Sequence, residues 1–188
     1  LKLIRMKKIF ALFFVLAIGL AIFSACEKDD ICPGDTLTTP YLKVGFYDFS
    51  NQDANKAVPS LRIIGIDSTG FRDTLNTFID RSNQTAVDIP LKTSENSSQF
   101  LIIYNSRDNE ETGEELGNID TLKFNYTRQE RFISRGCGYA TSFTDLVTIL
   151  NPAYTNDSIQ NPGEWINAIF DQDENLEHQD TIHVKIYH

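Results

Sequence analysis

The chain has 188 residues, of which 26 are acidic and 17 basic, and its formal net charge at pH 7 is −9. This acidic composition disfavours nucleic-acid binding, because neutralising phosphates requires clustered lysine or arginine. The 163 residues that follow position 25 suit one domain with a substantial core.

Residues 1–25 resemble a bacterial lipoprotein signal peptide. Lys7–Lys8 supply its positive charge, Ile9–Phe23 its apolar run, and two small residues precede Cys26. The run is shorter than the ~20 apolar residues of a spanning helix, which favours cleavage and lipidation at Cys26 over an uncleaved membrane anchor. Met6 is the expected start of translation, so residues 1–5 are expected to lie outside the translated chain.

Cleavage would leave a more acidic chain. It would remove four basic residues and no acidic one, so the mature net charge would be −13. Such a surface should also repel anionic lipid head groups. Residues 26–40 are expected to form a lipidated tether of at most about 3.5 Å per residue, and residues 41–188 a single domain.

Cys32 and Cys137 remain as a pair if Cys26 carries lipid. Disulfides persist in exported proteins, so we predict that the two cysteines are bonded. The bond would close a loop of about 100 residues and contribute ~4 kcal/mol in the chain-entropy model. Two separate reduced cysteines are the alternative, and a metal site is disfavoured because no histidine is near either residue in sequence.

After the tether, the chain has the pattern of an all-β protein. Leu122–Thr127 and Ile182–Tyr187 alternate apolar and polar residues, as strands with one buried and one wet face do. Turn-forming clusters separate further short aromatic and β-branched runs. These are Tyr41–Phe49, Leu61–Ile66, Ala86–Leu91, Phe100–Tyr104, Phe143–Leu150 and Trp165–Phe170.

Strands at this spacing predict a sandwich or a barrel. We favour an antiparallel, immunoglobulin-like β-sandwich of about eight to ten short strands. The last of these runs could instead follow a short helix, since Pro162 and Glu164 could open one.

Five segments resemble signatures of a family of uncharacterised lipoproteins from flavobacteria and their relatives. They are Asp30–Pro33, Val58–Leu61, Asn125–Glu130, Arg135–Tyr139 and His183–Tyr187. The family is a domain of unknown function, so the resemblance implies lineage and a cell-envelope, outer-membrane location but no activity. It also supports the pairing of Cys32 with Cys137.

This lineage gives meaning to two further motifs. Lys28–Asp30 resembles a signal for export to the outer face of the outer membrane, although an ordinary solvated tether is the alternative. A triplet of Asp, then Ser or Thr, then an aliphatic residue or Thr resembles an acceptor for O-linked glycans, but turn-to-strand junctions also generate it. The candidate acceptors are Thr36, Ser68, Thr74, Thr121, Ser158 and Thr181.

No residue set identifies a catalytic site, a cofactor or a metal site. The histidines, His178, His183 and His188, read as exposed polar positions at a terminal strand. Asp171–Asn175 begins like a calcium loop but lacks its Gly and its bidentate Glu, so this segment and Glu110–Glu115 read as solvated acidic loops. The aromatics could line a sugar-binding face, but we expect most of them in the core. They are Tyr41, Phe46, Tyr47, Phe49, Phe143 and Trp165.

Two function classes follow from the sequence. The favoured one is a non-enzymatic binding or assembly module, held to the membrane through lipid on Cys26 and presenting its loops to an envelope protein or glycan. The alternative is a hydrolase, or a calcium-dependent glycan-binding protein, that acts on an envelope or extracellular polymer. Convergent carboxylates in a deep pocket would favour the alternative.

Overall fold

The computed structural model describes residues 14, 32, 39–67, 69–70, 72–152, 165–176 and 181–188. The chain falls into two compact units, Leu1–Leu37 with Phe132–Ala140, and Thr38–Arg131 with Thr141–His188. Cys26 and the expected signal peptide lie outside the described residues apart from Phe14. In the described part of the chain, no helix is both long enough and apolar enough to cross a membrane.

Ten strands form in the described residues, and the all-β prediction is confirmed. They are β1 (Leu42–Tyr47), β2 (Val58–Ile66), β3 (Arg72–Thr74), β4 (Ser82–Gln84), β5 (Ala86–Ile89), β6 (Ser97–Tyr104), β7 (Asn118–Ser134), β8 (Gly138–Leu150), β9 (Ala168–Asp171) and β10 (Val184–Tyr187).

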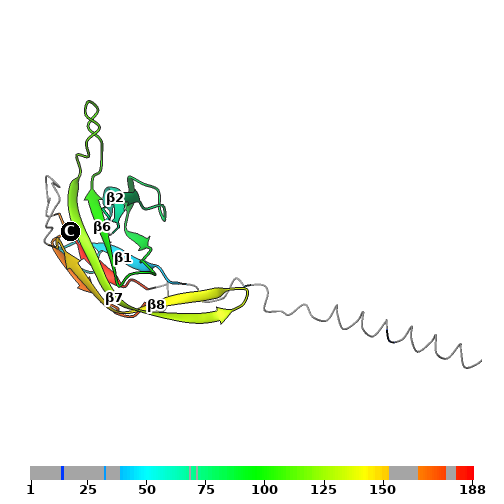
Figure 1. Ribbon diagram of the computed structural model, residues 1–188. Coiled ribbons are helices and arrows are strands. Elements are labelled where there is room, and N and C mark those ends of the chain that lie inside the picture. Colours follow the sequence, from blue (N-terminus) through cyan, green and yellow to red (C-terminus); the bar gives the residue numbers. More distant parts are fainter. Residues whose placement is uncertain are drawn as a thin grey trace, which may run out of the picture. The chain divides into compact units, whose positions relative to one another are not determined.

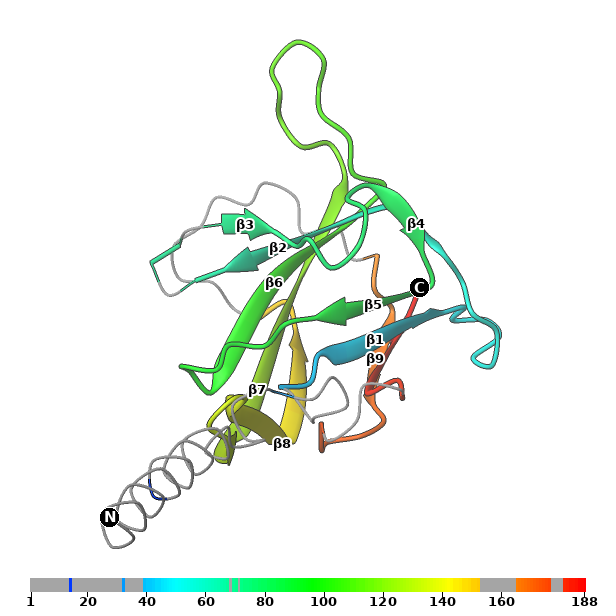
Figure 2. The ribbon, with the colours of Figure 1, turned by 90° about the vertical axis from the view of Figure 1, so that its right-hand side faces the viewer.

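The strands form two sheets, which Figures 1 and 2 show in two orientations. The smaller sheet has the order β5-β1-β10-β9, and the larger has the order β3-β2-β6-β7-β8 with β4 also pairing with β2. The prediction of a purely antiparallel fold is wrong, because β1 and β10 pair in parallel from Val44 with Val184 to Tyr47 with Tyr187. The fold is not a barrel, and the immunoglobulin-like class stays a prediction.

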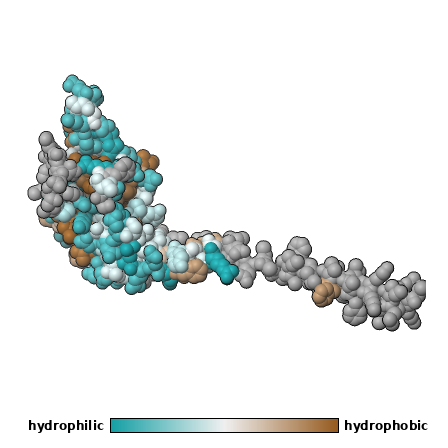
Figure 3. Space-filling view, in the orientation of Figure 1, coloured by the Kyte–Doolittle hydropathy of each residue, from teal (hydrophilic) through white to brown (hydrophobic). Residues whose placement is uncertain are grey.

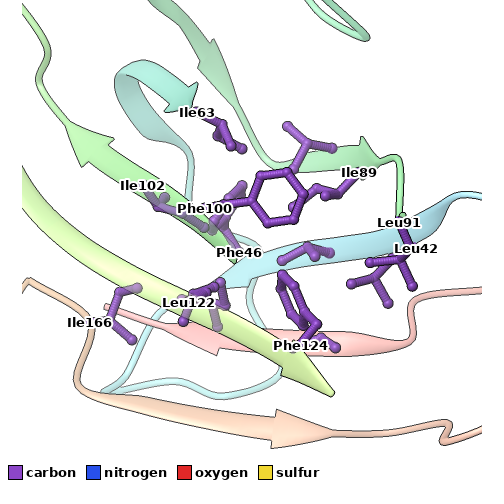
Figure 4. Packing of buried hydrophobic residues seen from close by; sticks show 14 of the residues in the cluster. Leu42, Phe46, Ile63, Ile89, Leu91, Phe100, Ile102, Leu122, Phe124 and Ile166 are labelled. Atoms are coloured by element: carbon purple, nitrogen blue, oxygen red, sulfur yellow. The ribbon is translucent and has the colours of Figure 1, made fainter. Parts of the chain in front are cut away.

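One hydrophobic core lies between the two sheets of the larger unit. Figure 4 shows Phe46 of β1 and Ile89 of β5 pointing toward Phe100 of β6 and Phe124 of β7. The predicted alternation is confirmed in β7, where Leu122 and Phe124 are fully buried and Tyr126 is 5% exposed. Burying side chains of this size contributes roughly 1.5–3 kcal/mol each, so this core is the main source of stability.

The terminal strand differs from its prediction. We expected one wet face, but His183 is fully buried and Tyr187 is 9% exposed. The physical reason is that side chains of the neighbouring strand β1 cover the face of β10 that we expected to be wet, since pairing with β1 and β9 at its two edges would not by itself bury a face. The ring of Tyr187, for example, lies 5.9 Å from that of Tyr47 on β1.

The sequence did not predict the two short strands β3 and β4, and it predicted the start of β9 several residues too early. The missed strands, β3 and β4, have only three residues each and no apolar alternation. Trp165 precedes β9 rather than beginning it. It lies against the core, where its indole nitrogen donates a hydrogen bond to the carbonyl oxygen of Ile102 at 3.1 Å. Pro162 and Glu164 lie outside the described residues.

Candidate functional site

A groove of about 500 Å³ lies at one end of the larger sheet, between β2, β3, β6 and the segment that follows β5. Gly65 forms part of its floor together with Phe100, which is 5% exposed. A Cβ on Gly65 would lie 3.5 Å from the Phe100 ring, which is ordinary contact. The lining is completed by Ile66, Asp67, Asp73, Thr74, Leu75, Asn76, Pro90, Lys92 and Gln99.

The polar groups of the groove are in part already engaged. The carboxylate of Asp67 accepts hydrogen bonds from the amide and the hydroxyl of Thr69, at 2.8 and 2.7 Å. The ammonium group of Lys92 lies 3.3 Å from a carboxylate oxygen of Glu95. The groove thus mixes carboxylates, amides, a hydroxyl and an ammonium group over an apolar floor, a combination that suits an uncharged ligand rich in hydroxyl groups.

A charged cluster connects β2 to the long β6–β7 loop, which extends beyond the strands in Figure 2. Arg62 of β2 binds Asp80 through two nitrogens and lies 3.4 Å from Glu115. Arg81 binds Asp108. Burial alone would raise the pKa of Glu115, but hydrogen bonds from Ser106 and from the backbone amides of residues 107 and 117, with the charge of Arg62, lower that pKa overall. The cluster fastens the loop to the sheet.

A buried carboxylate holds the segment before β9. Asp120 of β7 is fully buried. One of its carboxylate oxygens accepts the backbone amides of Trp165 and Ile166, both at 2.9 Å, and the other accepts the side-chain amide of Asn151 at 2.7 Å. Charge-assisted bonds of this kind are about twice as strong as neutral ones, so Asp120 is a structural residue of the core.

The six candidate glycan acceptors are in different environments. Thr74 on β3 and Thr181 before β10 are exposed, whereas Thr121 on β7 is only 5% exposed. Thr36, Ser68 and Ser158 lie outside the described residues. Thr74 also lines the groove.

The predicted disulfide is present. Cys32 and Cys137 are bonded, with their Cα atoms 4.7 Å apart and a sequence separation of 105. Cys137 lies in the turn of the β7–β8 hairpin, where Gly138 has a φ of 73°, a left-handed conformation that favours glycine. The bond therefore joins the segment that follows Cys26 to the tip of this hairpin.

The tip also carries two exposed aromatic rings. Phe132 near the end of β7 is 55% exposed and Tyr139 at the start of β8 is 71% exposed. Their ring centroids are 5.4 Å apart in an edge-to-face arrangement. Sequence analysis missed this pair, although Tyr139 ends the Arg135–Tyr139 motif that contains Cys137 and Phe132 lies three residues before it.

The histidine prediction is wrong for the two described residues. The Nδ1 atom of the buried His183 accepts the amide of Lys43 at 3.0 Å. His188 is 8% exposed, and burial lowers the pKa of its imidazole. The ammonium charge of Lys56 contributes to the lowering, although a hydrogen bond to the Lys56 carbonyl opposes it. His178 lies outside the described residues.

The acidic loops and the aromatics have mostly structural contacts. Asp171 accepts the amide of Thr148 at 2.9 Å and also its hydroxyl, and Asp173 accepts the amide of Asn175 at 3.0 Å. Among the described residues, no three histidine, cysteine or acidic side chains converge as a metal site requires. Phe46, Phe143 and Trp165 belong to the core, Tyr41 and Phe49 are exposed, and Tyr47 is half-buried.

Comparison with known proteins gives one match. Residues 60–188 match the model of a family of unknown function, DUF6452. The chain belongs to this family. No curated protein and no solved structure matched the chain.

The region shared with the DUF6452 family begins at Ser60 within β2 and includes every later strand. It therefore contains the groove, Asp120 and Cys137. Cys26, Cys32 and β1 precede the matched region, so the family assignment rests on the larger part of the β domain and brings no activity with it.

Proposed function

We propose that this protein is a lipid-anchored, non-enzymatic binding or assembly module of the cell envelope, held to the outer membrane through Cys26. The observation that carries the proposal is the Cys32–Cys137 bond. Structural disulfides form in oxidising compartments, so the bond supports export. Together with the signal-like residues 1–25, it supports processing as a lipoprotein of flavobacterial type.

The proposed binding surface is the groove beside β3. Its apolar floor and mixed polar lining suit a glycan, whose ring faces are apolar and whose edges carry hydroxyl groups. The two sheets would present this groove as immunoglobulin-like sandwiches present their loops. An O-linked glycan on Thr74 would lie at the groove, whereas one on Thr181 would not line it.

The alternative is a hydrolase, and one observation favours it. Asp67 and Asp73 contribute carboxyl groups to the same groove, and glycoside hydrolysis uses a pair of carboxyl groups. The carboxylate of Asp67 is held by Thr69, as an orienting contact would require. Under this alternative, one of the two acts as general acid and the other as base or nucleophile.

The anchor is tested by expressing the full chain in a lipoprotein-processing bacterium fed with an alkyne-labelled fatty acid. We expect the wild-type protein to be labelled and to begin at Cys26, and Cys26→Ala to carry no label. Cys32→Ala is the matched control and should keep the label. Label that persists on Cys26→Ala would contradict the proposal. Protease treatment of intact cells then tests display on the outer surface, which predicts digestion of the domain.

The groove is tested by incubating the native protein with soluble envelope polysaccharide. We expect the wild-type protein to retain the polysaccharide without shortening it, and Asp73→Ala to bind less. Asp53→Ala changes an exposed carboxylate that does not line the groove and should bind normally. Shortened polysaccharide would favour the hydrolase, and equal binding by both variants would remove the groove from the proposal.

A further inference from the structure

We propose that the tip of the β7–β8 hairpin is a membrane-contacting surface, and that Phe132 and Tyr139 lie in the interface of the bilayer that carries the anchor. This inference rests on the proposed lipidation of Cys26. It adds a second contact with the membrane, which neither the family nor the fold assigns.

The disulfide places the tip close to the anchor. Cys26 and Cys32 are six residues apart in sequence, so the chain between them spans at most about 21 Å at ~3.5 Å per residue. Because Cys137 is bonded to Cys32, the hairpin tip must stay within a short reach of any lipid on Cys26. Such tethering raises the effective concentration of the tip at the lipid surface.

The exposed side chains of the tip suit a lipid interface. Phe132 and Tyr139 are 55% and 71% exposed, and they pack edge to face against each other rather than into the core. Exposed apolar clusters on soluble domains usually mark a partner surface. Aromatic rings, tyrosine above all, are enriched at the level of lipid head groups, where one end is apolar and the other wet.

The charge of the tip is opposite to that of the chain. Residues 131–140 contain Arg131 and Arg135 and no acid, whereas the mature chain has a net charge of −13. Arg128, farther along β7, donates its hydrogen bonds to Asn96 and to the carbonyl oxygen of Thr93 instead. The acidic remainder should be repelled by anionic head groups, and this short basic segment should be attracted. Phosphate groups of lipids are therefore the partner that fits the aromatic pair and its arginine neighbours together.

The test measures how close the tip is to lipid in the acylated full chain. Tyr139→Trp places a reporter at the tip, and Phe170→Trp places one on β9, at a side chain that is 56% exposed and lies in the other unit. The native Trp165 is buried and gives the same background in both variants. Each protein is reconstituted into vesicles of phosphatidylethanolamine and phosphatidylglycerol, with or without brominated acyl chains.

We expect brominated lipid to cause a marked loss of emission, with a blue shift, for Tyr139→Trp and no loss beyond background for Phe170→Trp. Equal quenching at both positions, or none at position 139, would overturn the inference. Intact mass of the same samples reports acylation. An unacylated chain would refute the proposed lipoprotein, whereas an acylated chain without quenching would refute only the tip contact.

Two further measurements test the role of the disulfide and the identity of the partner at the tip. Replacing both Cys32 and Cys137 with Ser in the Tyr139→Trp chain should reduce the quenching. The same double serine variant without Tyr139→Trp has Trp165 as its one fluorophore, and unchanged emission from it shows that the larger unit is folded. Quenching that survives this change would remove the disulfide from the inference. A photoreactive group at position 139 should form lipid adducts, and adducts with protein instead would identify a different partner and overturn the membrane contact.

Discussion

Replacing Asp120 by asparagine should destabilise the fold strongly, although the two side chains have nearly the same shape. One carboxylate oxygen accepts two backbone amides, and the other accepts the side-chain amide of Asn151. Asparagine has one oxygen and one NH₂ group. In either orientation its NH₂ group faces at least one donor, so a buried donor loses its partner.

The magnitude follows from this count. Leaving one buried donor unsatisfied costs about 1–3 kcal/mol, and bonds to a charged acceptor are worth about 1.5–3 kcal/mol each. We therefore expect Asp120→Asn to lower the free energy of unfolding by roughly 2–4 kcal/mol, a large fraction of the 5–15 kcal/mol that is usual for a domain. The segment that contains Trp165 should detach from β7 first.

The assay is urea unfolding followed by tryptophan fluorescence and by far-UV circular dichroism. Trp165 is the only tryptophan of the chain, and its own amide binds Asp120, so its emission reports this contact directly. Asp108→Asn is the matched control, because that carboxylate pairs with Arg81 at the surface and its loss should change the free energy of unfolding far less. An Asp120→Asn protein within about 0.5 kcal/mol of wild type would refute the reasoning, since surface substitutions change stability by that amount.

Three other perturbations have definite expected outcomes. Burial lowers the pKa of His188, so the unfolded chain binds more protons than the folded one, and the free energy of unfolding should fall as the pH drops below about 6.5. His188→Gln should flatten this fall in urea titrations between pH 5 and 7.5. Parallel curves for the variant and the wild type would contradict the argument. Reduction of the Cys32–Cys137 bond should lower the free energy of unfolding by about 4–5 kcal/mol in the chain-entropy model, and an unchanged urea midpoint with dithiothreitol would contradict it. A Cβ on Gly117 would lie 2.5 Å from Ile103 and 2.9 Å from a backbone oxygen, so Gly117→Ala should lower the free energy of unfolding by about 1–3 kcal/mol. Gly65→Ala should be nearly neutral, because a Cβ there makes ordinary contacts. Similar melting temperatures for the two variants would count against this packing argument.

The strands that could be predicted from the sequence are those whose burial alternates along consecutive residues. Leu122–Thr127 alternates because one face of β7 covers the core and the other does not, and this difference is visible in six residues. The pairing of β1 with β10 depends on residues about 140 positions apart. No local pattern encodes it, and it is this pairing that buries His183 on a strand that reads as half-exposed.

The candidate site was less accessible to sequence analysis for the same reason. The groove combines residues from β2, β3, β6 and the segment after β5, none of which forms a motif alone. Asp120 illustrates the opposite error. In sequence it belongs to a glycan-acceptor triplet, but in the fold its carboxylate binds three amides and the neighbouring Thr121 is buried. Burial, which the triplet does not encode, separates the two interpretations.

The pairing of Cys32 with Cys137 was predictable because it depends on an oxidising compartment and on the number of cysteines, and not on how the strands pair. Its consequence for the protein is mechanical. From Cys32 the chain reaches the larger unit along the backbone to Leu42, and the disulfide adds a second covalent route into β7 and β8 through Cys137. On the face that Figure 3 shows, hydrophilic residues predominate and apolar residues lie between them in scattered patches. The disulfide therefore does more than stabilise the hairpin, because it adds a covalent connection between Cys32 and the β7–β8 turn that the backbone alone does not provide.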